Sequence, residues 1–271
     1  MSDASQQLLN AALVELWPQR VMDANGLLPP ACDENAGWRV RDKSGGLFPA
    51  RITAQGEFAW CPEIAPPADP AGFRSAALER LTAHTELGTT VPLDDLLSCL
   101  DALQVDPAQY ATRTGLRLLP EPSHLHFAGF DRYGRSLWLE LHTALAWTRM
   151  LAAAANDGIT LEAISGFRSH RYQLGIFRRK LERGQTVAEI LQVNAAPGFS
   201  EHHTGLALDI SAPGEPAAEE SFEGTPAFEW LTANGATYGF TMSYPRDNPH
   251  GIVYEPWHWA RGHALRAAES F

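Results

Sequence analysis

The sequence predicts a protein of the α+β class, with helices and short strands mixed along the chain. Two observations carry this prediction. Short, partly alternating runs separated by glycine turns lie between residues 38 and 60, and an Ala/Leu-rich helical stretch begins at Ser136 and stops at Asn156-Asp157-Gly158. With 271 residues, 45% of them hydrophobic, the chain can form one large domain or two modest ones.

The net charge of −11 argues against nonspecific binding to nucleic acid or to an anionic membrane surface. One basic cluster has mostly helical spacing and is expected to be a solvated helix face, with Arg168 as the exception: Arg168, Arg171, Arg178, Arg179, Lys180 and Arg183. No stretch is long and apolar enough to span a membrane, and the first residues show no basic segment followed by an apolar run. We therefore expect a cytoplasmic location.

The three cysteines are Cys32, Cys61 and Cys99, and none forms a CxxC pair. An odd count without such pairs predicts buried or incidental thiols rather than a disulfide framework or a cysteine-rich metal site. A bridge between Cys32 and Cys61 stays open as an alternative.

The first part of the chain, residues 1–118, carries no catalytic motif and is expected to be an accessory region that supports the rest. Its expected elements follow from periodicity and from Gly and Pro signals. They are an amphipathic helix over 5–17, an antiparallel meander over 38–60, a Pro-rich linker over 62–72, and helices near 73–85 and 92–103.

Residues 119–271 are expected to form the catalytic domain. A mixed connector, 104–135, spans the boundary at residue 118. His124 and His126 in it would share one face of a strand, and polar surface is the preferred interpretation of this pair. The remaining expected elements are a helix over 136–155, a strand over 159–165, helices over 169–183 and 187–193, a strand over 206–210, a helix over 225–234 that begins at Thr225-Pro226, and strands over 240–244 and 252–260.

Three short segments hold the residue types of a catalytic zinc site: SGFRSHRYQ (165–173), PGFSEHHTGLALD (197–209) and EPWHW (255–259). His202 and Asp209 could supply two ligands from a loop and the strand that it feeds, and His258 could supply the third. Three ligands leave one position open for chemistry.

Two further residues complete this candidate site. Glu255 lies three positions before His258 and is a candidate for the base that takes a proton from the attacking water. Arg168 is a candidate for holding a developing oxyanion or a substrate carboxylate. Competing hydrolase classes lack their motifs, since GxSxG, SxxK and HExxH do not occur.

Taken in this order, the blocks SGFRSxxxQ, PGxSEHxTGLAxDI and EPWHW resemble those of the zinc D-alanyl-D-alanine carboxypeptidases of the VanY type, which are related to D-Ala-D-Ala dipeptidases and to the hedgehog signalling domain. The resemblance covers about residues 137–263. It implies a mainly antiparallel central sheet with flanking helices and a zinc cleft. It also implies Zn²⁺ ligation by His202, Asp209 and His258, where matching the whole motif favours His202 over His203.

The resemblance further implies that Glu255 is the base, that Arg168 contacts the substrate, and that four residues line the pocket: Gln173, Ser200, Tyr244 and Trp257. The implied partner is a peptidoglycan stem peptide or muropeptide ending in D-Ala, and the implied reaction is hydrolysis of its terminal peptide bond. Action as an L,D-carboxypeptidase or as a D-Ala-D-Ala dipeptidase stays open. A non-catalytic zinc-binding recognition module is the alternative of another class, and Glu255 disfavours it.

Overall fold

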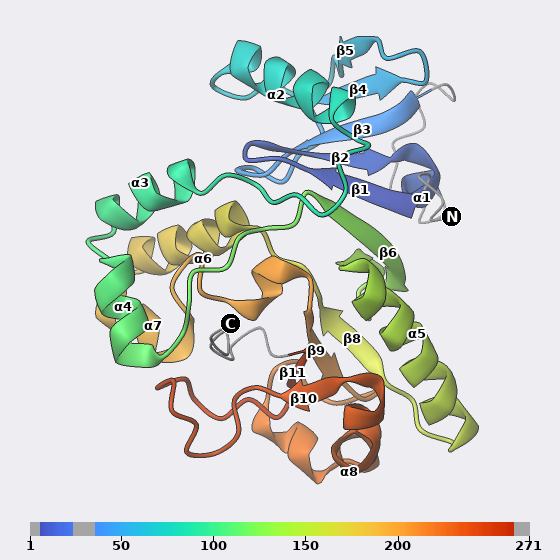
Figure 1. Cartoon of the computed structure of the whole chain (residues 1–271), viewed down its shortest axis with the longest axis vertical. Helices are drawn as coiled ribbons and strands as arrows, with labels where there is room; N and C mark the ends of the chain where they lie inside the picture. Colours follow the sequence, from blue (N-terminus) through green and yellow to red (C-terminus); the bar gives the residue numbers. More distant parts are fainter. Residues whose placement is uncertain (1–5, 24–35, 263–271) are drawn as a thin grey trace, which may run out of the picture.

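The structure is a computed structural model that describes residues 6–23 and 36–262 (Figure 1). It contains two antiparallel sheets, each with helices packed around it, which confirms the α+β class with antiparallel sheets. Cys61 and Cys99 are free thiols. Cys32, the other half of the alternative Cys32–Cys61 bridge, lies outside the described residues.

The larger sheet has seven strands in the order β5-β4-β3-β2-β1-β6-β7; in Figure 1 its strands β1 to β5 lie at the top of the molecule and β6 lies below them, beside α5. Its strands are β1 (Gln7–Asn10), β2 (Val14–Pro18), β3 (Ala36–Asp42), β4 (Ala50–Thr53), β5 (Phe58–Trp60), β6 (His124–Phe130) and β7 (Ser136–Leu139). Strands β3 to β5 form the meander expected over 38–60.

The helix expected over residues 5–17 is wrong, because this segment forms the hairpin of β1 and β2. Its apolar residues fit a helical period, yet the sheet is covered on both faces here. Leu8 packs into one cluster with Val21 and Leu125, while Leu9 packs into another with Val14. A strand buried on both faces has a continuous apolar run, which periodicity cannot separate from a helix.

The smaller sheet has four strands in the order β10-β11-β9-β8. They are β8 (Glu162–Ser165), β9 (Ala207–Ser211), β10 (Phe240–Met242) and β11 (His258–Arg261). The last strand is shorter than the 252–260 expected, since it begins only at His258. In the register of β9 with β11, Asp209 lies opposite His258, so the sheet itself brings these two side chains together.

The helices flank the sheets (Figure 1), and several begin at a side-chain cap that the sequence provides. Thr225 caps α8 with Pro226 at its first position, as expected, and Ser169 caps α6. The helices are α1 (Gln19–Asp23), α2 (Pro70–Thr82), α3 (Asp94–Ala102), α4 (Pro107–Thr114), α5 (Leu141–Asn156), α6 (His170–Glu182), α7 (Val187–Val193) and α8 (Pro226–Asn234), with 3₁₀ turns at Glu201–Thr204, Glu220–Gly224 and Gly235–Tyr238.

Two expectations for the middle of the chain need correction. Residues 136–139 form strand β7 and not the start of the helix, which begins after Glu140 caps it. His124 is buried on β6 and hydrogen-bonded at 2.9 Å to the Arg80 guanidinium, so its interpretation as polar surface is wrong. The spacing of His124 and His126 in the sequence does not indicate that His124 contacts Arg80, 44 residues earlier.

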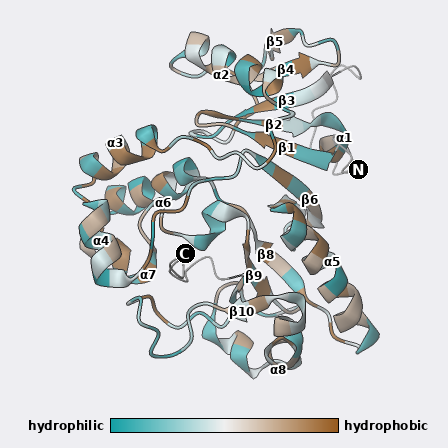
Figure 2. Ribbon diagram, viewed as in Figure 1, coloured by the Kyte–Doolittle hydropathy of each residue, from teal (hydrophilic) through white to brown (hydrophobic). Residues whose placement is uncertain are grey.

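The accessory region and the proposed catalytic domain share the larger sheet, because β1 pairs with β6. The boundary at residue 118 stays a proposal. Figure 2 shows α6 as a largely hydrophilic helix, in keeping with a solvated face for its arginines. Among the described residues, no helix has the length and apolarity needed to cross a bilayer.

Candidate metal centre and active site

The fold brings together the three candidate ligands that lie far apart in the sequence. One ligand atom each from His202, Asp209 and His258 lies within 4.8 Å of the other two, and all three residues are buried. His202 stands in the 3₁₀ turn before β9, Asp209 lies in β9, and His258 begins β11.

A glycine sets the path of the chain between His202 and Asp209. Gly205 has φ of +70°, and a Cβ there would lie 2.8 Å from the backbone nitrogen of Glu140. The Gly205 carbonyl also accepts a hydrogen bond from that nitrogen at 3.0 Å. Only glycine combines this left-handed backbone with so close an approach.

Backbone contacts fix the protonation of His202. Its Nδ1 lies 2.7 Å from the carbonyl oxygen of Gly166, which can only accept, so Nδ1 carries the proton. The Nε2 atom is then left with its lone pair, 3.2 Å from Oδ1 of Asp209. Burial and the nearby Arg168 lower the pKa of His202 to about 4, so the imidazole is neutral. A neutral imidazole with a fixed tautomer is the form that binds a metal.

His258 is oriented by a residue that the sequence analysis missed, Glu201. Glu201 is 2% exposed, and its Oε2 lies 2.9 Å from Nε2 of His258. This carboxylate holds a proton on Nε2 and leaves Nδ1 facing Oδ1 of Asp209 at 3.2 Å. Glu201 precedes His202 in the chain, but nothing in its spacing indicated that it reaches across to β11.

The carboxylate of Asp209 is the centre of this group. Burial alone would raise its pKa, but His202, His258 and Arg168 outweigh burial and hold the pKa well below its usual range. Its Oδ2 accepts a hydrogen bond from the Ser165 hydroxyl at 2.7 Å. The ionised carboxylate therefore has its second oxygen fixed while Oδ1 faces both imidazoles.

His203 is excluded as a ligand by its own hydrogen bonds. Its Nδ1 donates to the carbonyl oxygen of Arg168 at 2.6 Å, and its Nε2 accepts from the backbone nitrogen of Gly198 at 3.1 Å. Both ring nitrogens are thus used to hold loops, which agrees with the preference for His202.

Two imidazole nitrogens and one carboxylate oxygen form a donor set that suits Zn²⁺. Around a tetrahedral zinc with bonds of about 2.0–2.1 Å, neighbouring donors lie about 3.4 Å apart. The 3.2 Å distances from Oδ1 of Asp209 to Nε2 of His202 and to Nδ1 of His258 fit that geometry. The residues present therefore fit a three-ligand zinc site with an open fourth position.

Glu255 lies beside this centre without belonging to it. Its Oε2 is 4.0 Å from Nδ1 of His258, and its backbone nitrogen donates to the carbonyl oxygen of Tyr244 at 3.0 Å. Burial raises the pKa of Glu255 to about 7, with His258 acting in the opposite direction and Asp209 adding to the rise. A carboxylate with a pKa near neutrality suits proton transfer at physiological pH.

Arg168 also lies beside this centre, next to Asp209. Its guanidinium Nη2 lies 3.9 Å from Oδ2 of Asp209, and the side chain is 26% exposed. The Nε atom is buried, and within the described part of the chain it has no hydrogen-bond partner. A partly exposed guanidinium with an unused donor is suited to binding an anionic group beside the centre.

The four residues that the resemblance placed in the pocket lie in different surroundings, and their roles stay predictions. The ring of Tyr244 lies 4.8 Å from that of His258, and Ser200 is buried at the turn that carries His202. Gln173 is buried, and its amide nitrogen donates to the carbonyl oxygen of Ala195. Trp257 packs against the core of the smaller sheet.

A cavity of about 360 Å³ opens beside Asp209 and extends between the two sheets. Its inner side is formed by the segment from Ile164 to Ser169 and by Asp209, and its outer side includes Glu15, Trp17 and Arg41 from β2 and β3. The sequence analysis assigned no site residue to the accessory region, because its residues carry no motif of their own.

A mononuclear metal centre of two histidines and an aspartate, flanked by a carboxylate and a guanidinium, is the arrangement of a metal-dependent hydrolase. Residues 136–261 match the family model "VanY: D-alanyl-D-alanine carboxypeptidase". This part of the chain, residues 136–261, belongs to the VanY family.

Several individual proteins resemble about half of the chain. The YodJ protein of Bacillus subtilis (strain 168) is 36% identical over 134 residues, which are 48% of this chain and 48% of that protein. The bifunctional D-Ala-D-Ala dipeptidase and carboxypeptidase VanXYC of Enterococcus gallinarum is 29% identical over 51% of this chain and 74% of its own length. The solved structure of the LdcB LD-carboxypeptidase is 32% identical, with a TM-score of 0.49, over 52% of this chain and 69% of that one.

The chain thus spans about half the length of YodJ, and the family match leaves residues 1–135 outside it.

Proposed function

We propose that the protein is a zinc-dependent carboxypeptidase that removes the terminal D-Ala from peptidoglycan-type peptides. The observation that carries this proposal is the convergence of His202, Asp209 and His258, with Glu255 4.0 Å from His258 and Arg168 3.9 Å from Asp209. Such a site has three metal ligands, a base and an anion-binding group, and these are the parts that hydrolysis of a peptide bond needs.

Zn²⁺, when bound by these residues, supplies a Lewis acid that polarises the scissile carbonyl. Glu255 takes a proton as water attacks the carbonyl carbon, and it passes the proton to the amine as the C–N bond breaks. Arg168 binds the developing oxyanion or the terminal carboxylate of the peptide. The products are free D-Ala and a peptide shortened by one residue.

The substrate class is supported by the names of the relatives, which include D-alanyl-D-alanine carboxypeptidases and a bifunctional dipeptidase. An LD-carboxypeptidase is also among the similar structures. D,D-carboxypeptidase action is the main proposal, and L,D-carboxypeptidase or dipeptidase action by the same residues is the alternative. The partner is then a stem peptide or muropeptide ending in D-Ala, and the cytoplasmic location stays a prediction that cell fractionation tests.

A zinc-binding recognition module without activity would need the ligands but not a base. The Glu255 side chain is 16% exposed, and its Oε2 lies 4.0 Å from Nδ1 of His258. It therefore lies beside the three candidate ligands, where it can take a proton from a water molecule. This placement favours catalysis over recognition alone.

Mass spectrometry of product release tests the proposal. The zinc-loaded protein is incubated with a pentapeptide ending in D-Ala-D-Ala, with the tetrapeptide ending in one D-Ala, and with free D-Ala-D-Ala, each with and without a chelator. We expect chelator-sensitive loss of one D-Ala from the pentapeptide. Release of D-Ala only from the tetrapeptide would indicate an L,D-carboxypeptidase, and release only from the dipeptide would indicate a dipeptidase. No release from any of the three, with zinc fully bound, would refute the proposed enzymatic activity.

A further inference from the structure

The outer wall of the cavity beside the metal centre comes from a part of the chain outside the VanY match. Glu15 and Trp17 on β2 and Arg41 on β3 line the same cavity as Arg168 and Asp209. A peptide that extends from the centre past Asp209 into this cavity would lie against the accessory sheet. The wall residues are in a position to contact parts of the substrate that the family-matched residues do not reach.

Arg41 is held in a fixed orientation at this wall. Its Nη1 donates to Oε2 of Glu15 at 2.9 Å, its Nε donates to the carbonyl oxygen of Gly46, and its guanidinium lies 5.7 Å from the centre of the Trp17 ring. Glu15 is buried and also accepts from the indole nitrogen of Trp17 at 2.9 Å. A guanidinium fixed before binding loses little entropy when a ligand arrives.

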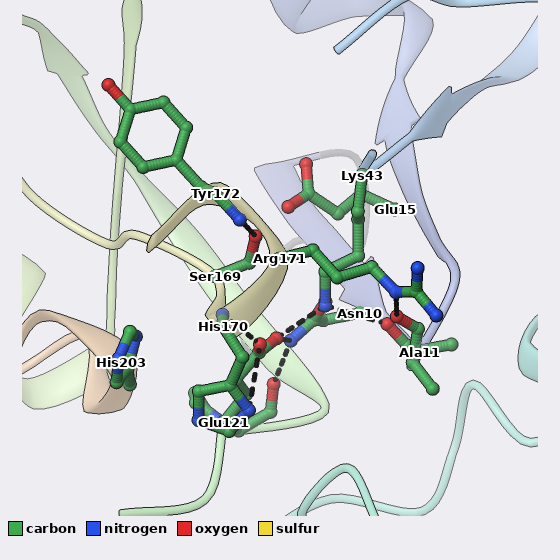
Figure 3. A network of polar contacts seen from close by, with 12 residues as sticks. Asn10, Ala11, Glu15, Lys43, Glu121, Ser169, His170, Arg171, Tyr172 and His203 are labelled. Carbon is green, nitrogen blue, oxygen red and sulfur yellow. Dashed lines mark hydrogen bonds and ion pairs between the residues drawn. The ribbon is translucent and has the colours of Figure 1, made fainter. Parts of the chain in front are cut away.

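The wall is also locked to the catalytic side of the molecule by a buried polar network (Figure 3). Lys43, next to the end of β3, makes an ion pair with Glu121 at 2.5 Å, and Asn10 donates to the same carboxylate oxygen at 2.8 Å. The other oxygen of Glu121 accepts from the backbone nitrogen of His170, two residues after Arg168. Glu121 therefore connects the accessory sheet to the segment that carries Arg168 through buried hydrogen bonds.

The arginines and a tryptophan in the cavity lining keep unused hydrogen-bond donors. The hydrogen bonds of Arg41 use Nε and Nη1, and those of Arg135 use Nε and Nη2. The indole nitrogen of Trp138, a residue only 4% exposed, has no partner among the described residues. The three carboxylates in the lining already accept hydrogen bonds: Glu15 and Asp131 from the two arginines, and Asp209 from the Ser165 hydroxyl. The ligand that complements this surface is rich in acceptors and carries negative charge.

We propose that the accessory sheet forms a subsite of the substrate cleft in which Arg41, fixed by Glu15 and Trp17, binds a carboxylate on the acyl side of a D-Ala-terminated peptide. The inference rests on the proposed function and adds to it. It assigns the accessory region a part in substrate selection. Arg135, 56% exposed in its side chain, provides a second guanidinium in the same lining.

A matched pair of substrates tests the subsite. Both are pentapeptides ending in D-Ala-D-Ala; one carries a γ-linked glutamate with a free α-carboxylate on the acyl side, and the other carries the corresponding carboxamide. We expect the wild-type protein to prefer the carboxylate peptide about tenfold in kcat/KM, the size of one charge-assisted hydrogen bond of about 1.4 kcal/mol. In Arg41→Gln the ratio should fall to about one.

Two further variants keep the test decisive. The double variant Glu15→Gln with Arg41→Gln removes both charges while an amide can still accept from Trp17, so it keeps the wall folded if Arg41→Gln alone does not. Arg149→Gln changes an exposed arginine on α5, outside the cavity lining, and should keep the tenfold ratio.

The outcomes separate the subsite from the activity itself. Equal hydrolysis of the two peptides by the wild-type protein, or an unchanged preference in the folded Arg41 variants, would overturn the subsite and leave the proposed activity in place. Absence of chelator-sensitive release from both peptides would instead refute the proposed function and the inference with it.

Discussion

Replacing Lys43 by Met removes the cation from a fully buried ion pair, and its cost can be derived from the contacts. The side chains of Lys43 and Glu121 are 1% and 2% exposed, and Lys43 also donates to Oδ1 of Asn10 at 2.9 Å and to the carbonyl oxygen of Ala11 at 2.8 Å. Burial alone would raise the pKa of Glu121, but Lys43 and then His170 outweigh burial and lower it. Without Lys43, a buried carboxylate loses its main counter-charge.

Removing one partner of a buried pair costs about 3–5 kcal/mol, because the other charge is left uncompensated. We expect Lys43→Met to lower the free energy of unfolding by about that amount and the melting temperature by about 6–20 °C. Urea unfolding followed by tryptophan fluorescence and thermal unfolding by circular dichroism measure both quantities. Activity at saturating zinc should fall as well, because Glu121 holds the start of α6 beside Arg168.

The double variant Lys43→Met with Glu121→Gln separates the charge from the packing. The amide oxygen that replaces the Glu121 carboxylate can still accept from the backbone nitrogen of His170, and no charge is left buried. We expect the double variant to be more stable than Lys43→Met by about 2 kcal/mol or more. A Lys43→Met protein within about 1 kcal/mol of wild type, or a double variant as unstable as the sum of the two single variants, would refute this reasoning.

Three more predictions concern the metal centre. Glu255→Gln should lower kcat by about 10²–10⁴-fold, with zinc retained at one ion per chain by elemental analysis; a fully active variant would remove Glu255 from the mechanism. Glu201→Gln should weaken zinc binding about 10–100-fold in a chelator competition, because the carboxylate no longer orients His258, whereas unchanged affinity would make Glu201 dispensable. Burial alone would lower the pKa of His258, yet its hydrogen bonds with Asp209 and Glu201 raise it to about 10, so the metal-free imidazole is protonated at pH 7. Zinc binding should then release about one proton, so the zinc affinity should increase about tenfold for each unit by which the pH rises below that pKa. Calorimetry in two buffers of different ionisation enthalpy measures the released proton; equal binding enthalpies in the two buffers would contradict this prediction.

The clustering of the three candidate ligands could be predicted from sequence because these residues lie in short segments with strong local signals. The turn at Gly205 and the strand after it fix the spacing of His202 and Asp209, and the pairing of β9 with β11 adds His258. Glu201 could not be predicted, because its contact with His258 joins residues 57 positions apart and depends on how the 3₁₀ turn is oriented.

The accessory region was harder to predict, for a related reason. Leu8 and Leu9 are both buried because each face of the larger sheet is covered, so the alternation that identifies a half-exposed strand is absent. The contribution of Arg41 to the cavity could not be predicted from the sequence either. It depends on the placement of β3 beside a segment more than a hundred positions later, and a single sequence gives no measure of such a contact.

The pairing of β1 with β6 also sets an order of events during synthesis. Gln7 and His126 are neighbours in the sheet although 119 positions separate them. Strands β1 to β5 can leave the ribosome and pair with one another, but the edge of β1 has to wait until β6 has been translated. Closing so long a loop is slow, and an open strand edge is a template for pairing between chains. We therefore expect the nascent chain to be most prone to aggregation between the completion of β5 and the emergence of β6, and to be protected once β6 covers that edge.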